Sequence, residues 1–157
     1  AEGWMGHRNT VPEWRDLLEQ GLIADTIEVS ATWSQIDAIY DDVVAALKTV
    51  PDCVNASAHS SHVYRSGINL YFTFACMPAD TAVMGDRYLE SWDRALTATA
   101  EAGGGIAHHH GSGRLRRDYL HYDLGENGLM LLRKLKQAID PQGIFNPGNL
   151  LPPADAD

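Results

Sequence analysis

Cysteine, long apolar runs and net positive charge are all scarce in this 157-residue sequence. Its two cysteines, Cys53 and Cys76, are too few for a disulfide framework and lack CxxC spacing, which favours free buried thiols in a reducing, cytoplasmic compartment. The longest uncharged apolar stretch, residues 67–78, falls short of the roughly 20 residues that a membrane helix needs. The N-terminus also lacks the basic and apolar layout of a signal peptide. These absences exclude disulfide-rich and membrane-spanning classes.

The overall charge is acidic, with 12 Lys and Arg against 21 Asp and Glu. An acidic chain disfavours general nucleic-acid binding, because phosphate neutralisation supplies most non-specific affinity for nucleic acids. All of the excess negative charge lies in residues 1–107, whereas residues 108–136 carry more basic than acidic side chains. This basic island begins with three consecutive histidines and indicates a local anion site.

The length and composition predict one globular domain over residues 1–157, because 45% hydrophobic and 21% charged residues are typical of folded chains. Strands are predicted where apolar and polar residues alternate, and helices where apolar residues recur every three to four positions. Capping boxes that begin at Thr10 and Ser34 mark the starts of two helices. The expected elements are a helix at 12–20, a strand at 26–30, a helix at 36–47, strands at 54–64 and 68–76, a helix from a cap at Asp80 to Gly103, and a brief strand at 106–107.

The order strand, helix, strand, strand, helix, strand predicts an α+β fold. It is the ferredoxin-like split βαβ arrangement, an antiparallel sheet with helices on one face. Two C-terminal helices are expected to follow, at 115–122 and 129–139. The turn-rich tail at 140–151 contains apolar side chains that need burial, so it should dock against something.

The sheet face turned away from the helices should be polar, because apolar residues alternate toward the helices. A solvated face is the simpler interpretation, since antiparallel sheets often wet one side. The alternative is a surface that roofs a ligand or another domain. The side chains expected on this face are Thr26, Glu28, Ser30, Asn69, Tyr71 and Thr73.

The segment from His108 to Arg117 carries the most chemical information. Three adjacent histidines cannot all face one way, so the spacing suits a metal poorly and no metal site is predicted. Gly111 and Gly113 allow close backbone approach to a ligand and precede a helix whose first turn would hold three arginines. Amides at a helix N-terminus together with guanidinium groups suit a phosphate or carboxylate. The arginines expected there are Arg114, Arg116 and Arg117.

Each of these features also has a structural interpretation. Histidines at a strand end often only donate or accept structural hydrogen bonds, Gly-x-Gly is a weak turn signal, and paired arginines often form a solvated helix face. A strand tyrosine such as Tyr71 is more often a packed amphipathic residue than an acid or base.

The stretch His-His-His-Gly-Ser-Gly-Arg-Leu-Arg at 108–116 resembles a signature of the alkyldihydroxyacetonephosphate synthases, within the FAD-linked oxidases of vanillyl-alcohol-oxidase type. The resemblance continues in order through Asp-Thr-Ile-Glu at 25–28 with Trp33, Ser-His-Val-Tyr at 61–64, Gly-Ile-Asn-Leu-Tyr-Phe at 67–72 and the tail at 140–151. It covers nearly the whole chain. The triple-histidine motif is specific, whereas the Asn-Pro-Gly tail is shared by many flavoprotein relatives.

The resemblance implies a C-terminal substrate or cap domain whose FAD-binding domain, expected as its partner, is absent from this chain. It implies FAD as the cofactor, ether-lipid chemistry that exchanges a fatty acid for a fatty alcohol, and a small-molecule or lipid-like substrate. The family's tyrosine base falls on Tyr71, which needs nearby positive charge or a reduced flavin to act near neutral pH. The other implied site residues are His108, His109 and His110 as acid–base groups, His109 being the preferred proton carrier, with Arg114, Arg116, Gly111 and Gly113 at the substrate and Asn146 and Asn149 at the cofactor.

Two alternatives stay open on the sequence. A D-lactate or glycolate type of 2-hydroxyacid dehydrogenase shares the Asn-Pro-Gly tail and would show net flavin reduction. A free-standing ferredoxin-like module could instead use the basic island to hold an anion, and an upstream reading frame for an FAD domain would argue against it. A homodimer is compatible with either.

Overall fold

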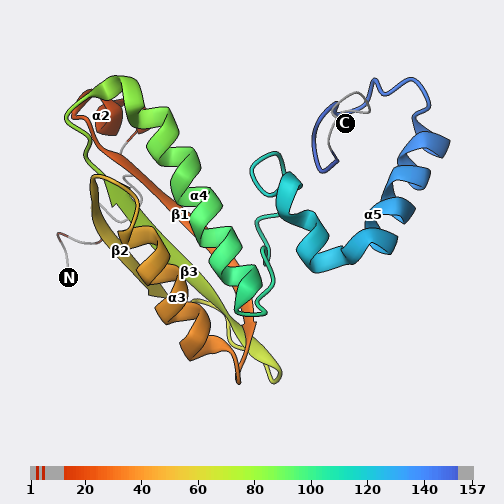
Figure 1. Ribbon diagram of the computed structural model, residues 1–157, viewed down its shortest axis with the longest axis horizontal. Coiled ribbons are helices and arrows are strands. Elements are labelled where there is room, and N and C mark those ends of the chain that lie inside the picture. Colours follow the sequence, from red (N-terminus) through yellow and green to blue (C-terminus); the bar gives the residue numbers. More distant parts are fainter. Residues whose placement is uncertain (1–2, 4, 6–12, 152–157) are drawn as a thin grey trace.

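The computed structural model describes residues 3, 5 and 13–151. Its main body is a sheet with two long helices, followed by a third long helix and a returning tail (Figure 1). The expected α+β class is confirmed. In chain order the elements are α2 (Trp14–Glu19), β1 (Ile23–Thr32), α3 (Ile36–Lys48), β2 (Cys53–His59), β3 (Gly67–Cys76), the 3-10 turn η1 (Thr81–Val83), α4 (Met84–Glu101), the 3-10 turn η2 (Arg117–Tyr119) and α5 (Leu120–Ile139).

The sheet is antiparallel with strand order β1-β3-β2, so the apolar strand β3 is central. Its alternation is the expected one, with Phe72 paired to Ile27 in the core and Tyr71 paired to Glu28 on the other face. The expected fourth strand is reduced to a bridge between Ser30 and Gly105, whose N–H groups and carbonyls exchange hydrogen bonds of 2.9 and 3.0 Å. That bridge still lies beside β1, as the ferredoxin-like order requires.

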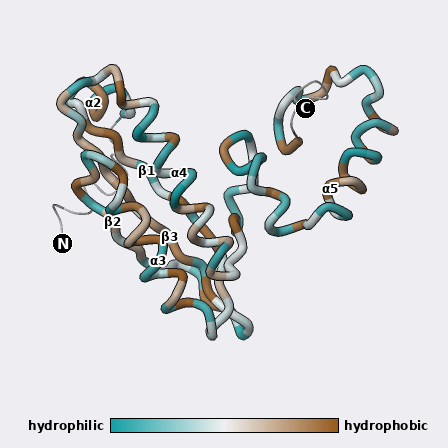
Figure 2. Tube along the Cα trace, in the orientation of Figure 1, coloured by the Kyte–Doolittle hydropathy of each residue, from teal (hydrophilic) through white to brown (hydrophobic). Residues whose placement is uncertain are grey.

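Helices α3 and α4 lie side by side over one face of the sheet, α3 mainly over β2 and α4 over β1 (Figure 1). Apolar residues recur at helical spacing on α3 and at every second position on β3, and Figure 2 shows hydrophobic and hydrophilic positions alternating along both elements. Burial of this apolar surface drives the fold. The fully buried centre includes Ile27, Val29, Ile39, Val43, Leu47, Phe72, Phe74, Leu96 and Ile106.

The helix ends follow local chemistry only in part. Asp80 accepts a hydrogen bond from the Ala82 amide, as expected of a cap, and Gly103 ends the α4 region with a φ of +81° that favours glycine. The capping box expected at Ser34 is not formed, because α3 begins after Gln35, whose side chain bonds the Thr32 amide and the Gly103 carbonyl instead. The capping box at Thr10 lies outside the described residues.

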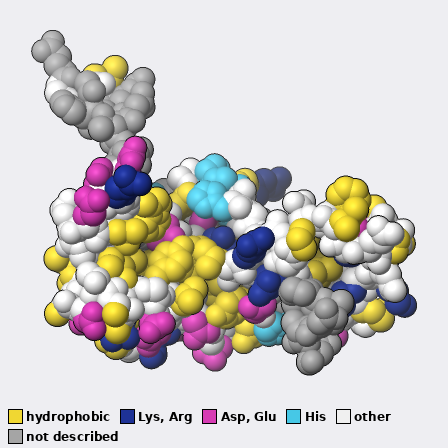
Figure 3. All heavy atoms as spheres, turned by 90° about the horizontal axis from the view of Figure 1, so that it is seen from above, with side chains coloured by type: hydrophobic (Ala, Val, Ile, Leu, Met, Phe, Trp, Pro, Cys, Tyr) yellow, Lys and Arg dark blue, Asp and Glu magenta, His cyan; other side chains and the backbone are white. Residues whose placement is uncertain are grey.

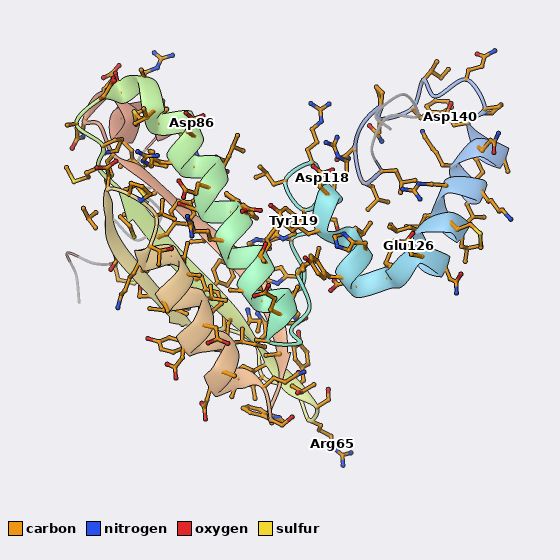
Figure 4. The ribbon with its side chains drawn as sticks, in the orientation of Figure 1. Arg65, Asp86, Asp118, Tyr119, Glu126 and Asp140 are labelled. Carbon is orange, nitrogen blue, oxygen red and sulfur yellow. The ribbon has the colours of Figure 1, made fainter. Side chains whose placement is uncertain are left out.

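The C-terminal helices differ from the expectation at their start. The first was expected from residue 115 but begins as a 3-10 turn at Arg117, so the glycine–arginine segment before it is a run of turns. The element α5 consists of two helical segments, as expected, which meet at a kink at Gly125, where φ is +62° and ψ is 174°. Tyr119 lies between α4 and the start of α5 and donates a 2.6 Å hydrogen bond to Asp93 (Figure 4).

The tail after α5 is organised by Asp140, labelled at the end of α5 in Figure 4. Its carboxylate accepts hydrogen bonds from Lys136 and from the amides of Ile144 and Phe145, at 3.0 Å for each amide. The apolar side chains of Ile144 and Phe145 nevertheless remain 65% and 62% exposed. The expected docking of this tail is therefore not completed by the described residues. No helix in the described part of the chain is long and apolar enough to cross a bilayer.

Candidate active site

The site is built around Glu28, a carboxylate with no exposed surface in the middle of β1. Its Oε1 accepts hydrogen bonds from the Asn69 side-chain amide at 2.6 Å and lies 3.1 Å from His108 Nδ1 and 2.9 Å from His109 Nδ1. Its Oε2 accepts from the His109 amide at 3.3 Å. Burial acts to raise the pKa of Glu28, but these donors outweigh it and hold the pKa below its ordinary value. The buried group is thus an anion that orients two histidines.

Asn69 joins this carboxylate to the connection between β2 and β3. Its side-chain oxygen accepts hydrogen bonds from the Ser61 and His62 amides at 3.0 and 2.8 Å. The strand expected to run to residue 64 therefore stops at His59, because the chain folds over Asn69 instead of continuing the ladder. This places His62 against the histidine segment, with ring centroids 4.8 Å from His109 and 5.4 Å from His108.

Tyr71 and His110 form the exposed part of the site. The Tyr71 hydroxyl is hydrogen-bonded to His110 Nε2, while His59 stacks on the Tyr71 ring at 5.2 Å between centroids. The side chains of His109 and His110 are 47% and 37% exposed. Figure 3 shows the histidines gathered on one face, with basic side chains beside them. An acid–base pair is thus presented outward.

The pKa of the Tyr71 phenol is raised by burial and by the negative charge of Glu28, against a smaller opposing effect of Arg116. The nearby positive charge expected to help this phenol ionise is present in Arg116, but burial and Glu28 outweigh it, and the role of Tyr71 as a base stays a prediction. The buried carboxylate at the centre of the site was missing from that expectation.

Arg116 is in the interior, only 5% exposed, and does not lie in the first turn of a helix. Its guanidinium donates hydrogen bonds to the carbonyls of Ile106, Gly111 and Glu28 at 2.9, 3.3 and 3.1 Å and lies 4.8 Å over the Trp92 ring. Burial lowers its pKa, opposed by the charge of Glu28. Where the fourth strand is missing, Arg116 thus bonds the free edge of β1. Because hydrogen bonds within the chain occupy its guanidinium, Arg116 is better suited to a structural role than to the predicted contact with the substrate.

Arg114 remains the accessible cation of the expected anion site. It is exposed, and no hydrogen bond or ion pair within the described chain engages its guanidinium. Gly111 and Gly113 both have positive φ, +75° and +56°, which explains why glycine stands at these turns. The Gly113 carbonyl accepts a hydrogen bond from the Leu150 amide at 3.3 Å, so the tail is held next to this loop.

Asn146 and Asn149, predicted at the cofactor, lie on that exposed tail and not among the histidines. The backbone N–H of Asn149 donates a hydrogen bond to the Asn146 carbonyl at 3.1 Å. The Arg117 guanidinium donates another, at 2.9 Å, to the carbonyl of Gly148, which lies between the two asparagines in the sequence. Their side chains form no part of the cluster around Glu28. Whether they contact a cofactor stays a prediction.

One group of described residues has the composition of a metal site. Potential ligand atoms of Glu28, His62, His108 and His109 all lie within 4.8 Å of one another, and imidazole with carboxylate is a donor set that zinc accepts. Hydrogen bonds already occupy both oxygens of Glu28. Those hydrogen bonds account for the position of the Glu28 carboxylate, so the four potential ligands are not by themselves evidence of a metal site.

Three residues of this cluster, Glu28, His62 and Asn69, were not identified as site residues from the sequence. Glu28 and Asn69 were expected on the polar face with Tyr71, and the missing signal was the strand register, in which Glu28 pairs with Tyr71 and Ser30 pairs with Asn69. That register depends on which strands are neighbours, and the sequence pattern did not settle it. The simpler interpretation of this face, that it is solvated, is wrong at Glu28 and Asn69, which are fully buried.

Residues 2–150 match the family described as FAD linked oxidases, C-terminal domain. The chain is 33% identical over 168 residues to the FAD-linked oxidoreductase YgcU of Escherichia coli, covering 96% of this chain and 34% of that protein. It is 32% identical over 159 residues to an alkyldihydroxyacetonephosphate synthase of Trypanosoma brucei brucei, covering 95% and 25%. A mitochondrial D-2-hydroxyglutarate dehydrogenase of Bos taurus matches over 86 residues at 33% identity, covering 54% and 15%.

The fold agrees with these sequence matches. A solved structure of an alkyldihydroxyacetonephosphate synthase superposes with a TM-score of 0.59 at 25% identity, covering 94% of this chain and 24% of that one. The chain thus spans about a third of the length of YgcU and about a quarter of the length of the synthase. With the family match over residues 2–150, the resemblance read from the triple-histidine motif is confirmed. The chain belongs to the C-terminal domain family of the FAD-linked oxidases.

Proposed function

We propose that this chain forms the substrate-facing side of an active site in an FAD-dependent enzyme of the alkyldihydroxyacetonephosphate synthase kind. The observation that carries the proposal is the outward-facing pair of Tyr71 and His110, backed by histidines that the buried Glu28 orients. Acid and base groups that lie next to each other and are oriented by a buried anion are typical of sites that transfer protons.

The described residues fit the reacting part of a flavin better than its dinucleotide. A pyrophosphate is usually held where a strand passes through a glycine-rich turn directly into a helix. Gly111 and Gly113 follow no strand of the described chain, and the next helix begins only at Arg117. We infer that a separate FAD-binding domain holds the cofactor and that FAD, when bound, supplies the redox or electrophilic centre.

In this proposal the residues of the chain handle protons and charge. Because the pKa of Tyr71 is raised, its phenol is protonated at neutral pH, and the hydrogen bond to His110 provides the path by which that proton can leave. His109, fixed by Glu28 through both its ring and its amide, carries protons at the exposed edge of the cluster. The cytoplasm stays the expected location.

We assign the substrate's anionic group to Arg114, the exposed guanidinium beside the Gly111–Gly113 turns. Arg114→Ala in the complete enzyme is expected to raise KM for a phosphorylated substrate by about 10-fold, as one charge-assisted hydrogen bond would. Arg114→Lys should recover part of it. Arg94→Ala, on α4 where Arg94 pairs with Glu90 at 2.7 Å, is the control and should leave KM unchanged. An unaltered KM in Arg114→Ala would remove the anion role.

A second candidate is a 2-hydroxyacid dehydrogenase, favoured by the match to D-2-hydroxyglutarate dehydrogenase. The two functions differ in net electron flow. The complete protein should be assayed anaerobically for flavin bleaching with a panel of 2-hydroxyacids and, in parallel, for exchange of the acyl group of acyl-dihydroxyacetone phosphate with a fatty alcohol. We expect exchange without lasting bleaching. Turnover-dependent bleaching by a 2-hydroxyacid, without exchange, would replace the first proposal with the second.

A further inference from the structure

The two cysteines, which are far apart in the sequence, are direct neighbours in the sheet. Cys53 at the start of β2 is the cross-strand partner of Cys76 at the end of β3. The flanking Met77 amide donates a 2.9 Å hydrogen bond to the Asp52 carbonyl. A bond between the residues on either side marks Cys53 and Cys76 as a non-hydrogen-bonded antiparallel pair, the type in which side chains come closest.

This geometry is compatible with a covalent link. Cα atoms of a non-hydrogen-bonded pair lie about 4.5 Å apart, which is within the range of about 4.4–6.8 Å that disulfides span. Both thiols are free in the structure, with Cys53 half-buried and Cys76 buried. The pKa of Cys76 is raised by burial, lowered to a smaller extent by its hydrogen bond with Ser91, and raised further by the neighbouring Cys53, which agrees with two thiols in one pocket.

The positions of the thiols also decide which reacts first. Cys53 follows the turn at Asp52 and its thiol donates only a weak 3.4 Å contact to the Asn55 carbonyl, where the β2 ladder is irregular. Cys76 is covered by the core and contacts Ser91 at 3.8 Å. An oxidant in solution therefore meets Cys53 before Cys76.

We propose that Cys53 and Cys76 form a redox-active pair that closes to an intrachain disulfide when the protein meets a small-molecule disulfide. With oxidised glutathione, the Cys53 thiolate attacks one sulfur and releases one glutathione thiolate. The Cys76 thiol then loses its proton, attacks Sγ of Cys53 and releases the second glutathione. Two protein thiols are oxidised and one glutathione disulfide is reduced to two thiols. The link joins β2 to β3 on the sheet itself, apart from the histidine cluster.

The test uses the full-length protein incubated with oxidised glutathione, alkylated and digested with trypsin. Cleavage after Lys48, Arg65 and Arg87 puts Cys53 and Cys76 in different peptides, each with a single cysteine. We expect a dithiothreitol-sensitive linked species of these two peptides, exceeding the glutathionylated Cys53 peptide by at least about tenfold. Glutathione remaining on Cys53 as the main product, or no reaction in the folded protein while the unfolded protein reacts, would overturn the proposal.

Single-cysteine variants separate the two steps. Cys76→Ser should stop at the mixed disulfide on Cys53, whereas Cys53→Ser should leave the buried Cys76 largely unmodified. In the wild-type protein the linked form should unfold at a temperature about 5–10 °C higher than the reduced form, because closing the loop restricts the unfolded chain. Equal modification of Cys76 in Cys53→Ser would contradict the assigned order and with it the paired site.

Discussion

Glu28 shows how much a single buried charge can organise. A carboxylate without exposed surface is costly unless donors surround it, and here an amide side chain, two imidazoles and a backbone amide do so. The same bonds fix the rings of His108 and His109, which leaves their other edges for chemistry. At the residue scale, the stability of the site and the orientation of its histidines depend on one group.

Glu28→Gln should therefore affect rate and stability together. The glutamine side chain has the shape of glutamate but carries no negative charge for the surrounding donors to bind, so we expect the free energy of unfolding to fall by about 1–3 kcal/mol. Displaced histidine rings should lower kcat by about 10- to 100-fold with a smaller change in KM. Glu90→Gln, which breaks the Arg94 ion pair on α4, serves as control. A loss of stability with kcat unchanged would give Glu28 a structural role only.

Tyr71→Phe tests the proposed acid–base pair directly. Removing the hydroxyl breaks its bond to His110 while keeping the ring stacked on His59, so circular dichroism and the flavin spectrum should be unchanged. The kcat of the complete enzyme should fall by about 10²- to 10⁴-fold. Tyr40→Phe, on α3 at the opposite face of the sheet, should retain full activity. Near-normal turnover of Tyr71→Phe would exclude Tyr71 from the mechanism.

At the scale of elements, a short segment and one side chain stand where a fourth strand was expected. The bridge to Gly105 provides hydrogen-bond partners for the backbone of Ser30 in β1. The Arg116 guanidinium donates a hydrogen bond to the carbonyl of Glu28, two residues earlier on the same strand edge. A full strand there would have carried the histidine segment along the sheet edge. Because pairing stops at Gly105, the chain is free to cross over the polar face and bring His108 to Glu28.

The turn after α5 should make stability depend on pH through Asp140. The hydrogen bond from Lys136 holds the pKa of Asp140 below its ordinary value of 3.8, against burial and with help from the amides of Phe145 and Ile144. A carboxylate with a depressed folded-state pKa stabilises the fold above its unfolded pKa and loses this effect as the pH falls through the folded one.

Asp140→Asn is therefore expected to unfold at a lower temperature than wild type at pH 6, and the difference should shrink as the pH is taken below about 3.8. Thermal unfolding measured from pH 6 to pH 3 checks this. Asp41→Asn, on the exposed side of α3, is the matched control. A difference between Asp140→Asn and wild type that stays constant across the range would show that the carboxylate charge is unimportant to this turn.

At the scale of the whole molecule, the two parts of the chain differ in how completely they are packed. The sheet and its two helices bury a continuous core to which α5 adds Leu120 and Leu129, whereas the rest of α5 and the tail line a groove of about 1000 Å³ and expose many apolar side chains. Exposed apolar surface of this extent is typical of an interaction surface. The large apolar side chains exposed on this part are Tyr122, Leu124, Met130, Leu131, Leu135, Ile139, Ile144, Phe145 and Leu150.

This distribution supports the proposal that an FAD-binding domain completes the site. The 157-residue chain purified alone is expected not to retain FAD, because its glycine turns follow no strand that could hold a pyrophosphate. Absorption of the purified chain in the flavin bands, after incubation with FAD and desalting, checks this. A yellow protein with stoichiometric flavin would contradict the prediction and show that these residues bind the dinucleotide themselves.

The sequence by itself determined the elements and the family. Alternation along β3, helical spacing along α3 and α4 and the triple-histidine motif are local or motif signals, and the fold class and the family match agree with them. The cap expected at Ser34 and the helix start expected at residue 115 were wrong, because side chains such as Gln35 and Arg116 found partners far along the chain.

Only the tertiary structure decided what the polar face does. Whether Glu28 is solvated or buried depends on which segment crosses the sheet, and that crossing depends on a strand pairing that ends at Gly105. Strand register likewise brought Asn69 to Glu28 and Cys53 to Cys76. Contacts between distant segments depend on packing of the whole chain, so local sequence patterns do not contain them. A histidine motif thereby became a site arranged around a buried anion.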